Sequence, residues 1–540
     1  METDSAEGRV PAMDARRKEG VTNAWSGGSA AGRATRAFTG SERLPLLVQR
    51  GLRRCNTARV GCSATPPFEG PTGDASGSSP MRTDPRSWLP DLGLPGGHAC
   101  KSHHKARHSQ ARYVFREKTK VWLARCRSDF GFSRVKRDHL VHAVRERLVR
   151  LPPPYGSHYG VVQAPPPENG IPLMEVLPRL SRASEALGRV QALAEGMEDH
   201  FQISRILKRQ EAVSSAAIEG TSSTLDEILA VEETEDANAR AQAKQVRDYA
   251  VLLDRLVPEA RARGPALFDL AMIQRLHAAV MESDHAYEDV PGELRQAVIW
   301  IGGRGDIAYS TWNPPPPDRV RACLLDTVDY LRNEGLQAVH QNLITRMAVA
   351  HAHFEAVHPF RDGNGRVGRL LLPLMMAADG AVPLYLSPYI DAHREHYYAA
   401  LKRAQQRLEW AEMVGFLSDA IVGTVDELMR TRDALDRLRR EWLGRRRFRS
   451  NAASTRALDL LVNHPVLSVK RLGHLLDVTF AQAGRAVDQL VAVNILRERT
   501  GYQRNRVFVA GEVLSIVNRP FGAEPAVPDD RTDPPGKADA

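Results

Sequence analysis

Apolar residues recur at helical spacing along most of the chain after residue 170. The first such run comprises Leu177, Leu180, Leu187, Val190 and Leu193. A second predicted helix runs from about Phe201 to Glu219, where Gly220 provides a C-cap, and Thr224 followed by Glu227 is typical of the start of a third. Further periodic runs lie near residues 246–257 and 270–280. The pattern therefore predicts a mainly α protein.

One segment carries a strong strand pattern instead. Leu294–Ile301 is rich in β-branched and aromatic residues, and glycines at 302, 303 and 305 provide a turn. Ile307–Trp312 then returns before four consecutive prolines at 314–317. This order predicts a β-hairpin that stands out from the helices.

The next apolar stripe leads directly into polar residues. It consists of Leu343, Met347, Ala350, Phe354 and Val357. We expect this helix to stop at His358, because Pro359 disfavours the α conformation in the residue before it. A short glycine-containing loop follows, and the period of Val367, Leu370, Leu371 and Leu374 predicts another helix.

This loop has the composition of a phosphate-binding site. Glycines on both sides of Asn364 allow successive backbone N–H groups to point into one concavity, and the dipole of the following helix adds partial positive charge. Arg366 and Arg369 share a face of that helix, and one carboxylate, Asp362, can hold Mg²⁺ together with phosphate oxygens. The loop therefore predicts a polyphosphate site.

Residues 358–369 read His-Pro-Phe-Arg-Asp-Gly-Asn-Gly-Arg-Val-Gly-Arg and match every fixed position of the HxFx(D/E)GNGRxxR motif of Fic domains. The chain resembles this family over roughly residues 160–430, and its hairpin resembles the family's flap. The resemblance implies a helical Fic core with a β-hairpin flap and a helical N-terminal subdomain. It also implies an enzyme, a protein adenylyltransferase that uses ATP and Mg²⁺ to transfer AMP to a Ser, Thr or Tyr hydroxyl of a target protein.

The same resemblance assigns roles to the residues of the motif. His358 would be the general base, Asp362 would hold the Mg²⁺ that bridges the α- and β-phosphates, and Phe360 would anchor the loop. The residues that would bind the phosphates are Gly363, Asn364, Gly365, Arg366 for the β-phosphate and Arg369 for the γ-phosphate. The flap edge would either pair with an extended target segment or merely cover the pocket.

An inhibitory segment is expected upstream of this block. Ser215-Ala-Ala-Ile-Glu219-Gly220 matches the (S/T)xxxE(G/N) inhibitory motif of Fic proteins, and a carboxylate at a helix C-terminus favours a cationic partner. The resemblance implies that Glu219 forms a bidentate pair with Arg369 and so prevents productive ATP binding. Without this pair, AMP transfer should rise, including transfer to the protein itself.

The C-terminal part has a different pattern. Residues 431–449 are an Arg-rich stretch that we interpret as a solvated connecting helix. Three short predicted helices and a strand pair follow within residues 455–509, the order of a winged helix-turn-helix. Its candidate DNA contacts are Gln482, Arg485, Gln489, Arg504 and Arg506. Docking of a protein or a homodimer is the equally weighted alternative.

Charge and composition narrow the class of protein. Residues 1–150 hold 28 basic and 14 acidic side chains, residues 151–430 hold 27 and 38, and residues 431–510 hold 16 and 7. The first 110 residues lack any sustained period, which predicts disorder. No long apolar run suggests a membrane span, and five cysteines in 540 residues favour a reducing, cytoplasmic location.

We accordingly divide the chain into six parts: a basic, largely disordered extension (1–150), a helical Fic N-terminal region with the inhibitory motif (151–258), a Fic catalytic domain (259–430), a basic linker helix (431–450), a winged helix-turn-helix (451–515) and a disordered tail (516–540). Two other functions remain open. One is a DNA-binding regulator that senses nucleotide with a Fic fold, and the other is a Fic enzyme of different chemistry, such as removal of AMP or transfer of another nucleotide or phosphate.

Overall fold

Helices form most of the protein, as the apolar periodicity predicts. The computed structural model describes residues 137–166, 171–195, 204–234, 239–334, 342–446, 449, 451–500 and 505–526. These residues all lie within one compact unit of the chain, residues 102–540. The mainly α fold class is confirmed.

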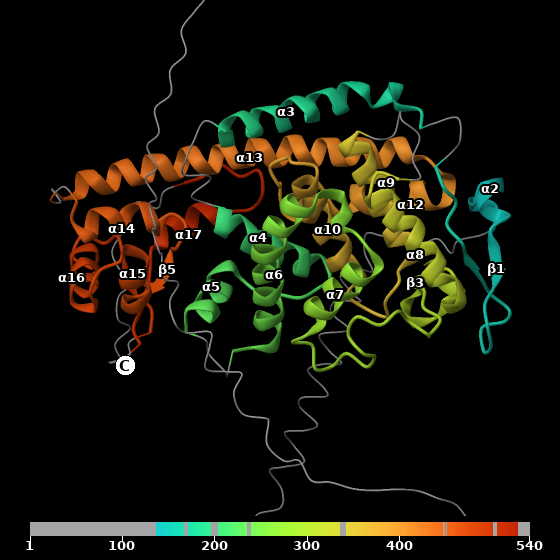
Figure 1. The fold of residues 1–540 in the computed structure, drawn as a ribbon, viewed down its shortest axis with the longest axis horizontal. Coiled ribbons are helices and arrows are strands. Elements are labelled where there is room, and N and C mark those ends of the chain that lie inside the picture. Colours follow the sequence, from blue (N-terminus) through green and yellow to red (C-terminus); the bar gives the residue numbers. More distant parts are fainter. Residues whose placement is uncertain are drawn as a thin grey trace, which may run out of the picture. The chain divides into compact units, whose positions relative to one another are not determined.

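The larger set of helices follows in chain order from residue 177 to residue 445 (Figure 1). Their bounds are Leu177–Glu195 (α3), Ser204–Ile218 (α4), Leu225–Thr234 (α5), Ala241–Arg263 (α6), Leu270–Met281 (α7), Pro317–Leu331 (α8), Leu343–Val357 (α9), Asn364–Ala378 (α10), Ser387–Ala392 (α11), Arg394–Arg407 (α12) and Trp410–Arg445 (α13).

The helices α9 and α10 lie at the centre of this set. All residues of α9 after its first are buried, and in α10 all except Gly365 are buried. A helix that is buried on every side needs small or apolar residues all round, which the Ala, Val and Leu content of both helices supplies. The loop that joins them, with the predicted phosphate-binding residues, is therefore held at both ends by the core.

The N-terminal boundary differs from the expected one. Residues 1–136 lie outside the described residues, but residues 137–150 contain a helix, His142–Arg145 (α2), and a strand, Leu148–Arg150 (β1). This strand pairs antiparallel with Tyr159–Val161 (β2), and Leu140 and Val144 are buried in a small apolar cluster with Trp312. The predicted disordered extension is thus wrong for residues 137–150, because these apolar side chains pack against the hairpin.

The predicted hairpin is present with shorter strands. Ile301–Gly302 (β3) pairs antiparallel with Ser310–Trp312 (β4), so the strand expected over 294–301 begins only at its last residue. The main chain before it bonds elsewhere: the amide of Arg295 donates to the carbonyl of Pro359 at 3.0 Å. Trp312 ties the hairpin to α9, because its indole N–H donates to the carbonyl of Ala356 at 3.0 Å.

The Arg-rich stretch belongs to one long helix. α13 starts at Trp410, packs along α3 (Figure 1) and continues through residue 445 without a break at 430. The prediction of a solvated connecting helix is wrong, since Leu435, Leu438 and Trp442 are buried. Their helical spacing gives the end of α13 an apolar face against the C-terminal part.

The C-terminal part holds the predicted order of helices and strands. It comprises Ala453–Leu461 (α14), Val466–Ser468 (β5), Val469–Leu476 (α15), Phe480–Val491 (α16), Arg497–Glu498 (β6), Val507–Val509 (β7) and Gly511–Val517 (α17). The strands form one antiparallel sheet in the order β5-β7-β6. A disordered tail from residue 516 is corrected: Ile516 and Val517 are buried in α17, and residues 518–526 are also described.

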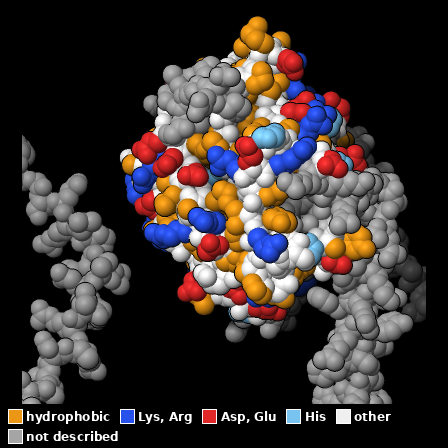
Figure 2. Space-filling view, turned by 90° about the vertical axis from the view of Figure 1, so that its right-hand side faces the viewer, with side chains coloured by type: hydrophobic (Ala, Val, Ile, Leu, Met, Phe, Trp, Pro, Cys, Tyr) orange, Lys and Arg blue, Asp and Glu red, His pale blue; other side chains and the backbone are white. Residues whose placement is uncertain are grey.

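Charges of both signs mix on the surface. Figure 2 shows one face, on which Lys and Arg side chains alternate with Asp and Glu side chains around apolar patches. Within the described residues, no helix is long and apolar enough to cross a membrane.

Candidate active site

His358 ends α9 in the left-handed conformation, with φ 48° and ψ 65°. Its amide donates to the carbonyl of Phe354 at 2.9 Å, and its own carbonyl accepts from Nε of Arg295 at 2.7 Å. A non-glycine residue keeps a positive φ only where its surroundings enforce it. The stop before Pro359 is thus as predicted, and the backbone that carries the imidazole is held from both sides.

The imidazole of His358 is arranged to accept a proton. Its Nδ1 lies 3.3 Å from the carbonyl oxygen of Glu355. Because a carbonyl can only accept, Nδ1 carries the hydrogen and the lone pair is on Nε2. Burial lowers the pKa of His358 to about 4, and the nearby Arg295 cation acts in the same direction. The side chain remains 23% exposed, so a neutral base reaches the surface at neutral pH.

The loop after His358 is closed by the side chain of Asn364. Its Oδ1 accepts from the amide of Phe360 and its Nδ2 donates to the carbonyl of Phe360, both at 2.8 Å. Gly363 has φ 76°, and a Cβ there would lie 2.8 Å from Sδ of Met281. The side chain of Asn364 therefore shapes the loop, which leaves its main-chain amide at the start of α10 to face a phosphate.

A histidine that the sequence analysis missed supports the loop from below. Phe360 is fully buried and stacks on His277 of α7, with ring centroids 3.8 Å apart. Nδ1 of His277 accepts from the amide of Gly292 at 2.8 Å, so Nε2 carries the hydrogen and donates to the carbonyl of Asp362 at 3.0 Å. Burial lowers the pKa of His277 to about 4. The one feature of the sequence that could have revealed His277 is its place on the apolar face of a predicted helix.

Asp362 and Arg366 face each other at the mouth of the loop. The carboxylate of Asp362 is 69% exposed, and its Oδ1 accepts from the amide of Gly363 at 2.7 Å. Arg366 is nearly buried, with Nη2 3.8 Å from Oδ2 of Asp362. Its Nε is buried and has no hydrogen-bond partner in the described part of the chain. A buried guanidinium N–H without an acceptor is unfavourable, so this group suits an anionic ligand.

Arg369, one turn further along α10, bonds to α4 through two of its three guanidinium nitrogens. Its Nε donates to Oγ of Ser215 at 3.0 Å, and its Nη2 donates both to the carbonyl of Ser215 at 3.0 Å and to Oε1 of Glu219 at 2.7 Å. The predicted pair of Glu219 and Arg369 is present, but it is a single hydrogen bond rather than a bidentate pair. Despite the opposing effect of burial, Arg369 keeps the pKa of Glu219 below its usual value.

Glycines let α4 approach α10 this closely. A Cβ at Gly365 would lie 2.1 Å from Oε1 of Glu219, so any larger residue there would displace the Glu219 side chain from its present position. Gly220 follows Glu219 with φ 83° and turns the chain away from α10. Both motif glycines thus serve the contact between the two helices, in addition to the role of Gly365 in the loop.

Arg295 is a second residue that the sequence analysis missed. It is 2% exposed and donates from three nitrogens to the carbonyls of His358 (2.7 Å), Ala297 (3.1 Å) and Pro315 (2.7 Å). These carbonyls belong to the end of α9 and to both sides of the hairpin. Burial lowers the pKa of Arg295 to about 10, which still leaves it charged. One buried cation therefore joins the flap to His358.

Comparison with protein families identifies these segments. Residues 177–254 match the family described as Fic/DOC family N-terminal, and residues 267–376 match the Fic/DOC family. Both segments are thus similar to the Fic/DOC family. The second match contains the loop and both arginines, and the first contains Ser215 and Glu219.

Several relatives of the Fic region have been named as adenylyltransferases. "Protein adenylyltransferase fic-1" of Caenorhabditis briggsae is 35% identical over 129 residues, which are 24% of this chain and 22% of that protein. "Probable protein adenylyltransferase aq_aa38" of Aquifex aeolicus is 36% identical over 118 residues, 22% of this chain and 32% of that one. The chain thus spans about a fifth to a third of these relatives. A Fic family protein of Desulfovibrio desulfuricans G20 aligns with 64% of this chain and 98% of its own, at 21% identity and a TM-score of 0.40.

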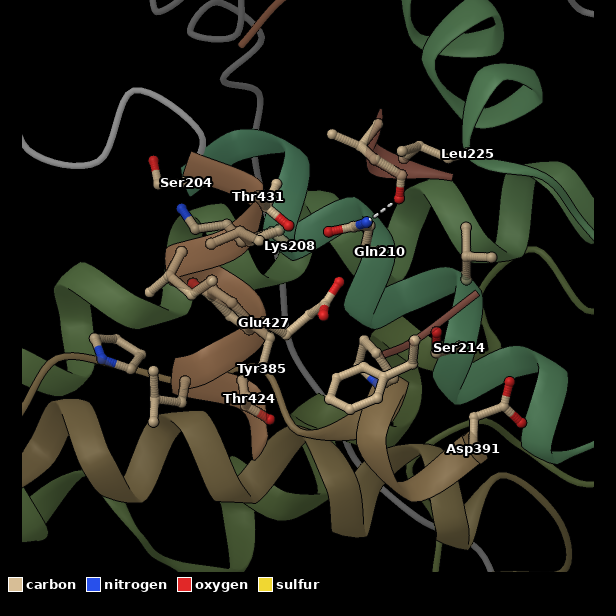
Figure 3. A pocket seen from close by; sticks show the side chains of 18 of the residues that line it. Ser204, Lys208, Gln210, Ser214, Leu225, Tyr385, Asp391, Thr424, Glu427 and Thr431 are labelled. Carbon is tan, nitrogen blue, oxygen red and sulfur yellow. Dashed lines mark hydrogen bonds between the residues drawn. The ribbon is translucent and has the colours of Figure 1, made fainter. Parts of the chain in front are cut away.

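A cavity of about 620 Å³ lies apart from the Fic motif. Residues of α4 from Ser204 to Ser214 line one side, and parts of α6, α11, α13 and residues 517–521 line the rest (Figure 3). The side chain of Gln210 crosses its edge and donates to the carbonyl of Val517, the bond drawn as a dashed line in Figure 3. Residues 358–369 are not among its described lining residues.

Proposed function

We propose that this protein is an adenylyltransferase that moves AMP from ATP to a hydroxyl group of a target protein. The observation that carries the proposal is the neutral imidazole of His358 beside a glycine loop that opens onto the N-terminus of α10. The names of the adenylyltransferase relatives support the same chemistry. A protein that only sensed nucleotide would not need a base at this position.

In the proposed reaction, Nε2 of His358 takes the proton of the incoming Ser, Thr or Tyr hydroxyl. The hydroxyl oxygen bonds to the α-phosphorus of ATP, the bond from that phosphorus to the bridging oxygen breaks, and pyrophosphate leaves. Glu355 keeps the required tautomer through its carbonyl, and Arg295 keeps the imidazole in place. Positioning of the reacting groups and proton transfer to the base account for much of the rate of such a transfer.

The phosphate chain would lie over the start of α10. Main-chain amides of the loop and the partnerless Nε of Arg366 offer donors to it, and Arg369 would bind the γ-phosphate once it is released from Glu219. The exposed carboxylate of Asp362 fits one ligand of Mg²⁺. No group of three or more His, Cys, Asp or Glu side chains in the described residues could hold a metal alone, so phosphate oxygens and water would complete the shell. Bound there, Mg²⁺ would neutralise charge on the phosphates.

We further propose that Glu219 and Ser215 inhibit the resting enzyme. They occupy Nε and Nη2 of Arg369, which a γ-phosphate would otherwise use, so ATP would bind without the alignment that in-line attack requires. We assign Ser215, Glu219 and the following Gly220 to this inhibitory segment.

Two labelled forms of ATP test the proposed reaction. Purified Glu219→Gly protein is incubated with a lysate and with ATP labelled at the α- or γ-phosphate. Retention of the α label alone on protein means AMP transfer, whereas retention of the γ label would mean phosphate transfer and overturn the proposal.

A second experiment tests the role of Asp362. Calorimetry of Asp362→Ala should show that Mg²⁺-dependent ATP binding is lost.

DNA binding by the C-terminal part is a second candidate function. Gln482 and Arg485 are exposed on α16, the third helix of the proposed winged helix-turn-helix. Arg506 is less suited to contact phosphate, because it pairs with Glu498 and lies over the ring of Phe508, and Arg504 lies outside the described residues. Binding to random duplex DNA should fall steeply with salt and should weaken in Arg485→Ala. Absence of any shift at low salt would leave protein docking or homodimerisation as its role.

A further inference from the structure

The inhibitory helix α4 is held at its far end by the C-terminal part of the chain. The amide of Arg205, in the first turn of α4, donates to Oδ1 of Asn463 at 3.2 Å, and its guanidinium donates to the carbonyl of Asn463 at 3.4 Å. Amides in the first turn of a helix have no partner within the helix. Asn463, 258 residues later, therefore caps α4 from another part of the molecule.

The capping is reciprocal. Glu233 at the end of α5 accepts at Oε1 from the amide of Ser468 at 2.9 Å and from its hydroxyl at 2.5 Å. Ser468 is itself the N-cap of α15. Buried Arg209 connects α4 to α5, because its Nε donates to Glu232 at 2.9 Å. The pair α4–α5 and the C-terminal part thus each complete the helix ends of the other.

One side of α4 borders an open pocket along the same stretch. This pocket of about 620 Å³ extends from Ser204 to Ser214, where Gln210 bonds to the carbonyl of Val517. The opposite side of α4 is buried, so the contacts with the C-terminal part are the ones that restrain the helix on the pocket side. α4 is a rigid rod of roughly 20 Å between Arg205 and Glu219 at about 1.5 Å per residue. A shift of its capped end is therefore transmitted to the contact with Arg369.

We propose that residues 453–517 regulate the Fic site by holding α4 in its inhibitory position. Asn463, Ser468 and Val517 restrain the helix, and their release lets Glu219 and Ser215 leave Arg369. A partner that binds the C-terminal part and disturbs these contacts would switch on transfer. This inference rests on the proposed inhibition by Glu219, and it makes the C-terminal part the regulatory partner of that contact within the same chain.

The test compares two double variants of the full chain. Asn463→Ala with Ser468→Ala removes both side-chain caps. Thr455→Ala with Ser515→Ala removes two hydroxyls from the same part of the chain, and these donate to the carbonyls of Arg449 and Gly511 rather than to α4 or α5. Hydrogen exchange of the amides of residues 206–218 and labelling from α-labelled ATP are measured for both variants and for the wild type.

The loss of each cap should shift the equilibrium by about fivefold, the usual worth of one hydrogen bond. Exchange in α4 and labelling should therefore both rise by at least about fivefold in the cap variant and stay at wild-type values in the control. In the Glu219→Gly background the cap variant should add nothing to labelling, because the contact it releases is already gone.

Equal exchange and equal labelling in the cap variant and the wild type would overturn the proposal. If Glu219→Gly also fails to label any protein, the proposed AMP transfer is wrong, while the exchange rates still decide whether α4 is restrained. Should the cap variant prove unfolded by circular dichroism, Gln210→Ala, which removes only the bond to Val517, must give the same rise in exchange and labelling for the proposal to stand.

Discussion

The two sides of the contact between Glu219 and Arg369 are built differently. Around His358 and the loop, buried side chains such as Asn364, His277 and Arg295 bond to main-chain atoms at 2.7–3.1 Å and leave little room to move. Along α4 the helix borders a large cavity, and its first turn depends on one asparagine from a distant segment. The catalytic side is held by core elements all round, whereas α4, although Arg209 and Glu211 anchor its middle, is the side that we propose can move.

The strongest test of the fixed side is removal of its base. We expect His358→Ala in the Glu219→Gly background to lower AMP transfer by about 10² to 10⁴, the usual scale for a general base. ATP affinity should stay unchanged, because the imidazole acts on the hydroxyl. If the double variant labels protein as fast as Glu219→Gly alone under single-turnover conditions, His358 is not the base.

Arg295 offers a graded test of the same side. Arg295→Met removes the donors that fix His358 and should lower kcat/KM by roughly 10- to 100-fold, as small misplacements of a base do. It also removes a cation that lowers the pKa of His358, so the acid limb of the pH–rate profile should move to higher pH. The other charged groups that act on this imidazole are Glu355, Glu219 and Asp362, which remain.

Arg295→Lys separates charge from shape. It keeps the cation but lacks the planar fork, so the rate should fall while the acid limb stays near that of wild type. Identical pH profiles for Met and Lys at position 295 would mean that Arg295 acts only through packing.

Glu219→Gly tests the movable side directly. It takes the carboxylate away from Arg369, and we expect labelling from α-labelled ATP, including self-modification, to rise by about tenfold or more. The matched control is Glu185→Gly, a carboxylate on the exposed face of α3. Equal labelling of Glu219→Gly and wild type would remove the inhibitory role and leave the catalytic one intact.

The smallest expected effect concerns Glu211, a buried carboxyl of α4 that accepts from the amide and hydroxyl of Ser387 at 2.8 and 2.6 Å. Burial raises its pKa to about 7 from an ordinary value of 4.5. Between these pH values the folded protein holds a proton that the unfolded chain releases, so this group makes folding less favourable as pH rises from 4.5 to 7. Relative to wild type, the Tm of Glu211→Gln should gain a few degrees between pH 5 and pH 8. An unchanged difference in Tm would show that Glu211 titrates normally.

Short stretches of sequence were enough to predict most of the segment that contains His358 and the loop after it. The stripe before His358, the effect of Pro359 and the glycines around Asn364 predict the helix stop, the loop and the next helix, because each depends on neighbours within a few residues. The inhibitory contact was also legible, since Ser215, Glu219 and Arg369 each lie in a recognisable motif. His277 and Arg295 were not found, because their function arises from main-chain atoms that lie 60 to 90 residues away in sequence.

Burial by distant segments explains the wrong boundaries. Leu140 and Val144 look like scattered apolar residues in a basic arm until Trp312 covers them. The arginines at the end of α13 suggested a helix exposed to solvent on all sides. The apolar residues between them, such as Leu438 and Trp442, instead pack on the C-terminal part. Periodicity predicts which face of a helix is apolar, but it does not say what covers that face.

The cap on α4 has a consequence during synthesis. Asn463 follows Arg205 by 258 residues, so at translation speeds of about 5–20 residues per second the ribosome needs on the order of 10 to 50 seconds to make it. For the last 85 residues of that interval, after Ala378, α9 and α10 are complete while α4 still has no partner for its first turn. The newborn Fic region thus passes through a period in which α4 is weakly held, and a segment made after the whole Fic region secures it.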